Sequence, residues 1–234
     1  MRKNRLQISI IIPVLNESEG IAHTLNYLTE NSSPENIKEI LIVDGGSIDN
    51  TVVIAEQNGG KAIHSPRGRS KQLNHGAKYA SAEILYFLHA DTLPPKDFDQ
   101  SIVNAVESGH KTGCFQMKFD SDSNFLSFFA WFTRVNHKLC RGGDQSLFIT
   151  EQFFKSSGGF NEAYVVYEDN EFIGRLYKKT SFKILPRHVK TSARRYEERG
   201  MLKLQYHFGM MHLKNYLGAG PEQLYDYYKR KISV

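Results

Sequence analysis

Short apolar runs alternate with helix-like segments over the N-terminal part of the chain, and this alternation constrains the fold more than any other feature. The runs are rich in β-branched residues and comprise Ile8–Leu15, Glu39–Val43, Lys61–His64 and Glu83–Leu88. Apolar runs without polar alternation are typical of strands buried on both faces of a parallel sheet. Helices and short loops between such strands predict right-handed strand–helix–strand units. The pattern therefore predicts an α/β fold with a mostly parallel sheet flanked by helices.

Helix signals lie between the predicted strands. Asn16 offers an N-cap with Glu19 three residues further on, which predicts a helix from there to Glu30. Asp49 is placed to cap a second helix, and the segment 69–80 is predicted as a third.

The second half of the chain has a less regular pattern. It predicts helices near 97–108, 124–138 and 168–179, and strands near 113–119, 146–150 and 182–185. From residue 200 the chain is predicted to be helical, with a break at 218–221. So short a segment is not expected to form a domain of its own. We therefore expect a main α/β domain over 1–199 and a C-terminal helical extension over 200–234 that packs on it.

Composition limits the class of protein. Of the 234 residues, 40% are hydrophobic, which suffices for a sizeable core and excludes a disordered chain. The formal net charge of +5 fits a small polyanionic ligand or an acidic membrane surface, and it is too small to imply nucleic acid. The two cysteines, Cys114 and Cys140, form no disulfide framework, so a cytoplasmic location is expected.

Membrane contact is expected to be peripheral at most. No run approaches the roughly 20 apolar residues that cross a bilayer. The run Ile8–Leu15 contains Pro13 and fits a buried strand better than a signal peptide. The aromatic stretch Phe125–Phe132 fits either a core helix or an amphipathic helix that touches the inner membrane face, with Arg134 and Lys138 beside it.

Polar side chains follow each predicted strand at its carboxyl end, where open parallel sheets bind ligands. They are Asn16 and Glu17, Asp44 and Gly45, Arg67 and Arg69, and His89 and Asp91. The cations of 67–71 lie at a predicted helix N-terminus and oppose its dipole, so an anion held between them explains their placement. No Gly-rich dinucleotide fingerprint or Walker loop is present, which argues against dinucleotide oxidoreductases and P-loop enzymes.

Each of these signals has a structural alternative. The segment Asp44–Ser47 is also a common tight-turn sequence, and Asp91 could cap the following helix. His89 alone fits a core or rim histidine. The pair Glu168–Asp169 fits an acidic first helical turn. The convergence of several strand ends is therefore a stronger signal than any one motif.

Five motifs resemble, in the same order, those of family-2 glycosyltransferases with the GT-A fold. They are Ile11–Glu17, Val43–Thr51, Leu88–Thr92, Gly158–Asn161 and Glu168–Asp169, which together span roughly residues 6–180. The segments Gly68–Asn74, His89–Thr92 and Gly143–Gln145 are similar to a bacterial subgroup of small, soluble members. The resemblance implies an inverting enzyme that moves a sugar from a nucleotide-sugar donor, a UDP-sugar, to a hydroxyl acceptor. The acceptor is unidentified, and the aromatic stretch suggests a lipid-linked or otherwise apolar one.

The resemblance also implies roles for the matching residues. On the donor side, Pro13, Asn16 and Glu17 would flank the ribose and base, Asp44, followed by Gly45, would accept a hydrogen bond from uracil, and Arg69 and Lys71 would lie near the base or diphosphate. On the acceptor side, Asp169 of the acidic pair Glu168–Asp169 would be the general base that takes the acceptor's proton.

A divalent cation, Mg²⁺ or Mn²⁺, is also implied by the resemblance, held by Asp91 and bridging the diphosphate oxygens. His89 stands where the family's motif has its first aspartate. An imidazole removes one negative charge, but it still donates a hydrogen bond or ligates Mn²⁺. Two alternatives therefore stay open. One is a metal-weak or non-catalytic nucleotide-binding module, and the other is a nucleotidyltransferase of related fold, although its Gly-rich loop is missing after the first strand.

Two weaker constellations lie near the C-terminus. Arg194 and Arg195 follow a predicted strand and could clamp a phosphate, or they could form an exposed pair. His207 or His212 could complete the shell of a bound metal.

Overall fold

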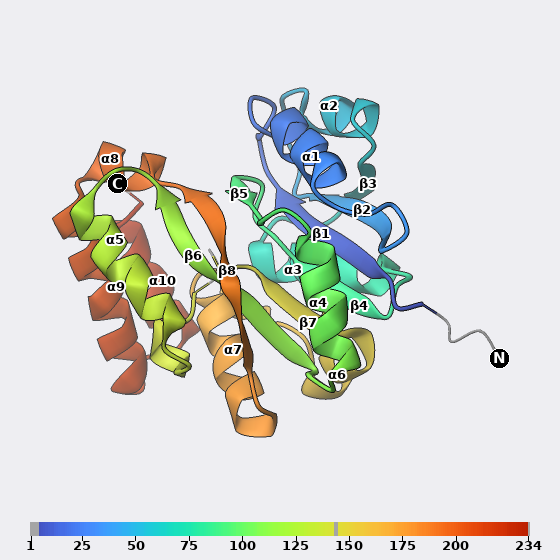
Figure 1. Cartoon of the computed structure of the whole chain (residues 1–234). Coiled ribbons are helices and arrows are strands. Elements are labelled where there is room, and N and C mark those ends of the chain that lie inside the picture. Colours follow the sequence, from blue (N-terminus) through green and yellow to red (C-terminus); the bar gives the residue numbers. More distant parts are fainter. Residues whose placement is uncertain (1–4, 143–144, 234) are drawn as a thin grey trace.

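The computed structural model describes residues 5–142 and 145–233, and within these ranges one mixed sheet runs through the molecule between helices (Figure 1). The strands are β1 (Ile8–Val14), β2 (Ile37–Asp44), β3 (Lys61–His64), β4 (Ile84–Phe87), β5 (Thr92–Leu93), β6 (Thr112–Asp120), β7 (Leu147–Thr150) and β8 (Lys183–Ser192). The helices are α1 (Ile21–Glu30), α2 (Thr51–Gln57), α3 (Arg69–Tyr79), α4 (Phe98–Glu107), α5 (Asn124–Trp131), α6 (Glu151–Ser157), α7 (Glu168–Lys179), α8 (Arg194–Arg199), α9 (Met201–Tyr216) and α10 (Pro221–Lys231).

The order of the strands in the sheet is β3-β2-β1-β4-β7-β6-β8-β5. The first four strands are parallel to one another, as the strand–helix alternation predicts. β7 is antiparallel to both of its neighbours, β6 and β8 are parallel, and β5 is antiparallel to β8. The predicted α/β class with a mostly parallel sheet is confirmed, and its carboxyl ends at β1, β2 and β4 lie at one edge.

Two apolar clusters cover the two faces of the sheet and explain why β1 is apolar at consecutive positions. Ile10 packs in one cluster with α1 and α4, whereas Ile11 packs in the other with α3 and α7. Figure 1 shows α4 in front of the sheet and α3 behind it. Both isoleucines are fully buried, and burying such a side chain stabilises the folded state by about 1.5–3 kcal/mol. Helices on both faces therefore hold the strand ends of the N-terminal half in place.

The C-terminal helices α9 and α10 form the hairpin that the break at 218–221 predicts. Leu204 and Met211 of α9 pack with Leu224 of α10 and with Leu126 of α5 in a third apolar cluster. Pro221 begins α10 at a position where a missing backbone N–H costs nothing. The division of the chain at residue 200 stays a prediction.

Some expected elements differ from the observed ones. The N-cap prediction at Asn16 is wrong, because α1 begins at Ile21 after Gly20 and no side chain caps it. Asn16 instead has a left-handed backbone, with φ +56°, and its Oδ1 accepts a hydrogen bond from the Ile48 backbone N–H at 2.9 Å. Its side chain is therefore used to join two loops, which a local capping pattern does not reveal.

The predicted helix over 124–138 is also wrong in extent. It ends as an α-helix at Trp131, and two short 3₁₀ turns, Phe132–Arg134 and Lys138–Cys140, follow. The elements α6, α8 and β5 were not expected at all. The motif segment at Gly143–Asp144 lies outside the described residues.

Candidate active site

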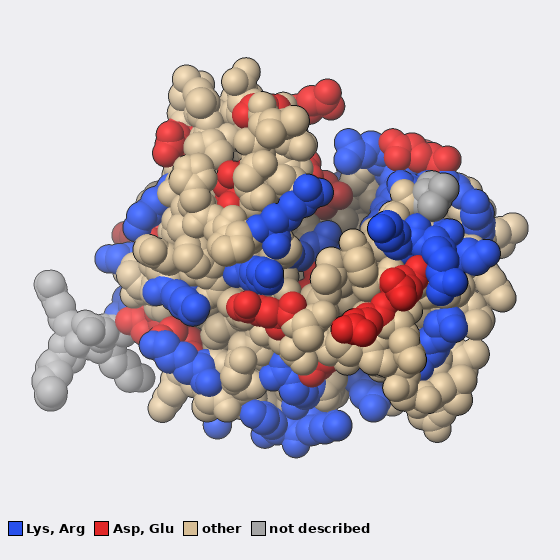
Figure 2. Space-filling model, turned by 180° about the vertical axis from the view of Figure 1, so that it is seen from behind, with Lys and Arg blue, Asp and Glu red and all other residues tan. Residues whose placement is uncertain are grey.

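Three adjoining cavities lie beyond the carboxyl ends of β1 and β4. We call them the outer cavity, of about 390 Å³, the neck, of about 150 Å³, and the inner cavity, of about 450 Å³. Glu17 and Asp91 line both the outer cavity and the neck, and Arg69 and His89 line both the neck and the inner cavity. Figure 2 shows the molecule hollowed between its N-terminal half and the side formed by the C-terminal helices. Together the cavities form one continuous path past His89.

The outer cavity is bounded by loops that follow β1 and β2 and are tied together by hydrogen bonds. The Asn16 backbone N–H donates to Ser47 Oγ at 2.9 Å, and the Ser18 backbone N–H donates to Asp49 at 3.2 Å. Hydrogen bonds from Thr51 and Ser18 lower the pKa of Asp49 to about 2. Burial and the nearby Asp91 carboxylate raise the pKa of Glu17. The cavity therefore has an acidic wall on a preformed loop pair.

Asp44, at the end of β2, is buried, and its carboxylate organises the turn that follows. It accepts hydrogen bonds from the backbone N–H groups of Gly46 and Ser47, both at 3.0 Å. Burial by itself would raise the pKa of Asp44, but the hydrogen bonds from Ser47 and Gly46 outweigh it, and the pKa is lowered. These contacts are the ones expected if Asp44–Ser47 is a tight turn. The hydrogen bond from uracil that the resemblance implies would be a further contact of Asp44.

Three residues assigned to the donor side lie outside the three cavities: Asp44, Gly45 and Lys71. A Cβ on Gly45 would lie 3.0 Å from the Gln72 side chain, which donates to the backbone of β1 and β2. Lys71 is exposed in the first turn of α3. The donor-binding roles of these three residues stay predictions. Pro13 lines the neck, and Asn16 and Glu17 line the outer cavity.

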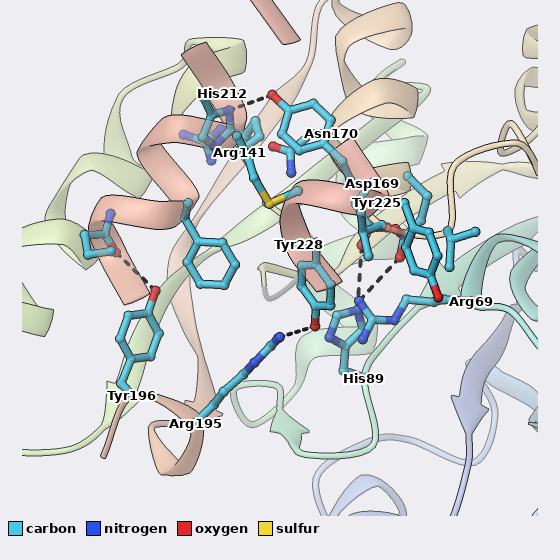
Figure 3. A pocket seen from close by; sticks show the side chains of 18 residues that line it. Arg69, His89, Arg141, Asp169, Asn170, Arg195, Tyr196, His212, Tyr225 and Tyr228 are labelled. Carbon is cyan, nitrogen blue, oxygen red and sulfur yellow. Dashed lines mark hydrogen bonds and ion pairs between the residues drawn. The ribbon is translucent and has the colours of Figure 1, made fainter. Parts of the chain in front are cut away.

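The neck brings together residues that are far apart in the sequence. Arg69, at the start of α3, lies 3.3 Å from Glu168 at the start of α7. His89 Nε2, after β4, lies 3.9 Å from Asp169 Oδ2 (Figure 3). The structure thus brings Arg69 and His89 to the pair Glu168–Asp169, whereas Asp44 does not line these cavities.

The two acids of α7 have different surroundings. The Glu168 side chain is 3% exposed, and burial together with the Asp169 charge raises its pKa to about 7, against the opposing effect of Arg69. The Asp169 side chain is 14% exposed and lies beside His89. Of the pair, Asp169 is therefore the one more open to a ligand in the inner cavity.

The inner cavity owes its far wall to residues that the sequence did not single out. Its aromatic lining includes Phe208 of α9. Tyr225 and Tyr228 of α10 belong to the same lining (Figure 3). The signal in the sequence was only a general abundance of Tyr and Phe near the C-terminus. Tertiary packing of the hairpin was needed to place these side chains opposite Asp169.

The two C-terminal histidines contact tyrosines. His212 Nδ1 lies 2.7 Å from the Tyr167 hydroxyl and His207 Nδ1 lies 2.7 Å from the Tyr227 hydroxyl. Burial lowers the pKa of His212. His212 lines the inner cavity but not the neck or outer cavity that Asp91 lines. Neither contact supports the expected role of these histidines in a metal shell.

The donor set around Asp91 fits a cation held largely by phosphate oxygens. Asp91 is exposed and close enough to Glu17 for their charges to repel, a repulsion that a divalent cation would relieve. Across 5–142 and 145–233, no group of three His, Cys, Asp or Glu side chains is arranged as a metal site. A Mg²⁺ or Mn²⁺ ion bound here would therefore take most of its ligands from substrate and water, as Mg²⁺ commonly does.

The aromatic stretch has one face in the core and one exposed. Leu126 of α5 is fully buried, whereas Phe128 and Trp131 are more than half exposed. The stretch therefore forms part of the core on one face and part of the surface on the other. In the described part of the chain, no helix has the length and apolar character needed to span a membrane.

Comparison with known proteins identifies a family and several relatives. The family described as Glycosyl transferase family 2 matches residues 9–185. The glycosyltransferase AglE of Haloferax volcanii is 33% identical over 106 residues, which cover 42% of this chain and 35% of AglE. The chain thus aligns with about a third of that relative's length.

Solved structures show the same fold at low identity. S. aureus TarS 1–349, in complex with UDP, has a TM-score of 0.65 and 18% identity, covering 80% of this chain and 60% of its own. The mannosyltransferase PcManGT of Pyrobaculum calidifontis, in complex with GDP-Man and Mn²⁺, has a TM-score of 0.69 and 17% identity, covering 97% of this chain and 70% of its own. These likenesses confirm the GT-A fold.

The class of protein that fold and site define is therefore an α/β transferase with its ligand path at the strand ends. The chain belongs to glycosyl transferase family 2, as its motifs predicted.

Proposed function

We propose that the chain transfers a sugar from a nucleotide-sugar, a UDP-sugar, to a hydroxyl acceptor with inversion at the anomeric carbon. The observation that carries the proposal is the position of Asp169, beside His89 at the junction of the neck with the inner cavity. A donor bound in the outer cavity and neck would present its sugar there. An acceptor in the inner cavity would approach the same point from the other side.

The donor side is supported by the residues of the first four strand ends. Pro13, Glu17 and Arg69 line the neck, and Asn16 lies further out. TarS binds UDP and PcManGT binds GDP-Man, which supports a nucleotide-sugar as the ligand on this side. The turn at Asp44 is retained in the proposal as the contact for the uracil ring.

Asp169 would act as the general base. Its carboxylate would accept the proton of the acceptor hydroxyl while that oxygen attacks the anomeric carbon from the face opposite the departing nucleoside diphosphate. Displacement in one step inverts the configuration. Glu168 is buried against Arg69, and in this scheme it positions Arg69 and the start of α7 rather than taking the proton.

A divalent cation belongs to the proposal on the donor side. Asp91 would hold it, with His89 as a second donor group, and the cation would offset the negative charge that develops on the departing diphosphate. Mn²⁺ suits a site with an imidazole better than Mg²⁺ does. PcManGT binds Mn²⁺ together with its donor.

The proposed setting is a cytoplasmic protein with at most peripheral contact at the inner membrane face. The half-exposed Phe128 and Trp131 support such contact, and a lipid-linked acceptor would fit it.

The test compares wild type with Asp169→Asn, using a panel of UDP-sugars with and without Mn²⁺. Release of UDP measures turnover, and calorimetry measures UDP affinity. We expect Asp169→Asn to retain UDP binding and lose turnover, while Asp122→Asn, an exposed carboxyl outside the cavities, matches wild type. UDP binding by wild type without any turnover would favour the non-catalytic nucleotide-binding module. Unchanged sugar transfer by Asp169→Asn would reject Asp169 as the general base.

A further inference from the structure

We infer that the acceptor is an anion, carrying a phosphate or carboxylate group next to an apolar or ring-shaped body, and that Arg195 binds its charge. The inference rests on the proposed function, because it names the class of molecule that the inner cavity takes. It starts from two arginines of a cavity with aromatic walls, Arg195 and Arg141, neither of which pairs with a carboxylate among the described residues.

Two neighbouring arginines at the end of β8 serve different cavities. Arg194 lines the outer cavity, whereas Arg195 lines the neck and the inner cavity. Ala193, at the N-cap of α8, is buried and separates the strand from these side chains. Arg194 thus belongs to the donor side, whereas Arg195 lies where the neck meets the inner cavity.

Arg195 is held by aromatic rings and not by a carboxylate. Its guanidinium lies 5.8 Å from the ring centre of Phe208 and 5.4 Å from that of Tyr228, and it donates a hydrogen bond to the Tyr228 hydroxyl (Figure 3). No carboxylate pairs with it among the described residues. Arg69, in contrast, is paired with Glu168. Aromatic contact orients a guanidinium but leaves its charge available to an anion.

A second arginine of the inner cavity is buried. Arg141 is 3% exposed, and its guanidinium donates to Gln145 Oε1 at 2.6 Å and to the Thr133 carbonyl at 2.7 Å. Its Nε has no hydrogen-bond partner in the described structure. Within residues 5–142 and 145–233 no carboxylate pairs with Arg141, and an anion bound in the cavity would offset the cost of burying its charge.

A residue that lines the same cavity also carries an unpaired polar atom in the described structure. Asn170 Oδ1, next to Asp169, is buried and lacks a hydrogen-bond donor in the described structure. It is an acceptor group, and a hydroxyl of the ligand would satisfy it once the amide turns toward the cavity. Cationic and hydroxyl-accepting groups therefore occur together beside the proposed base.

The remaining wall indicates the body of the ligand. Phe208, Met211, Tyr225 and Tyr228 present rings and a thioether to the inner cavity. Its volume of about 450 Å³ is in the range of small-molecule sites, about 300–1,000 Å³. An acceptor with both an anionic group and an apolar or ring-shaped part would use both kinds of wall.

Binding of phenyl phosphate tests the inference without knowledge of the natural acceptor. It is titrated by calorimetry into the full chain, with and without saturating UDP and Mn²⁺, and benzyl alcohol is the uncharged control. We expect phenyl phosphate to bind alongside UDP. Arg195→Gln should weaken that binding about tenfold or more, as loss of a charged hydrogen bond does, and Arg195→Lys should restore part of it.

Arg194→Gln is the matched variant. We expect it to weaken UDP binding and to leave phenyl phosphate binding unchanged. Equal phenyl phosphate affinity in wild type and Arg195→Gln would overturn the inference, as would an equal loss of UDP and phenyl phosphate affinity in Arg195→Gln. A wild type that binds phenyl phosphate but not UDP would instead count against the proposed function, because the anion site would then stand alone.

The anion could belong to a soluble ester or to a lipid headgroup, and competition separates the two. Displacement of phenyl phosphate by glycerol 3-phosphate supports a soluble acceptor. Displacement only by vesicles of phosphatidylglycerol supports a lipid headgroup. If glycerol or phosphatidylcholine vesicles displace phenyl phosphate as effectively as the anions do, the inference is contradicted. It is also contradicted if none of the anions displaces phenyl phosphate.

Discussion

The two ends of the ligand path are built in different ways. The outer cavity is formed by loops that directly follow strands, and backbone hydrogen bonds such as that from Asn16 to Ser47 hold these loops. The far wall of the inner cavity is formed by side chains of α8, α9 and α10, which pack with α5 and with residues 164–167 in one apolar cluster. The difference teaches that the outer cavity is preformed by loops at the sheet's edge, whereas the inner cavity depends on how a C-terminal hairpin is docked.

Removing the base should have the largest effect and should separate the two ends. For Asp169→Asn we expect kcat to fall by about 10²–10⁴-fold, the usual contribution of general base catalysis. UDP affinity should stay within about twofold, since Asp169 does not line the outer cavity or neck. Steady-state kinetics and calorimetry on the same preparation give both values, and a parallel loss of UDP affinity would contradict the division between the two ends.

Loosening the hairpin should damage only the inner end. Leu224→Ala removes a fully buried side chain of α10 from the third apolar cluster. We expect the free energy of unfolding to fall by about 2–5 kcal/mol. Turnover should fall while UDP binding persists at low temperature. Urea unfolding followed by circular dichroism measures the stability. Leu25→Ala in the cluster of α1 is the matched control, and it should impair UDP binding as well.

The acid pair of α7 gives the acceptor end a pH dependence. The pKa of Glu168 is raised from 4.5 to about 7, so the folded chain holds this proton more firmly than the unfolded chain does. This contribution to stability is complete below pH 4.5, and it is lost as the pH rises from there to about 7. Melting temperatures between pH 4.5 and 8 should show this decline in wild type and a smaller one in Glu168→Gln. The same slope in both would assign the effect to other groups.

Membrane contact should give the smallest effect. If the exposed face of α5 touches an anionic bilayer, Phe128→Ser with Trp131→Ser should reduce flotation with phosphatidylglycerol liposomes by a few fold, since each aromatic side chain adds only a modest burial. Tyr79→Ser, an equally exposed aromatic residue on α3, is the control. The absence of flotation in wild type would remove the membrane proposal and leave a soluble acceptor.

Much of the donor side was predictable because its signals are local. The strand Ile8–Val14 agrees closely with the sequence pattern, and so does the helix Glu168–Lys179 on the other side, since apolar runs and helical periodicity depend on neighbouring residues. The errors arose where a side chain acts at a distance. Asn16 has the residue type of an N-cap, but it bonds to a loop thirty-two residues away. No local pattern distinguishes these two uses.

The amino-acid order alone determined the parallel α/β framework and the residues at its strand ends, because burial on both faces of a sheet and the turns that follow are encoded within short segments. Only the tertiary structure decided that Arg195, Phe208 and Tyr228 would line a cavity shared with Asp169. That choice depends on how α9 and α10 pack on α5, and packing is a property of surfaces assembled from distant segments.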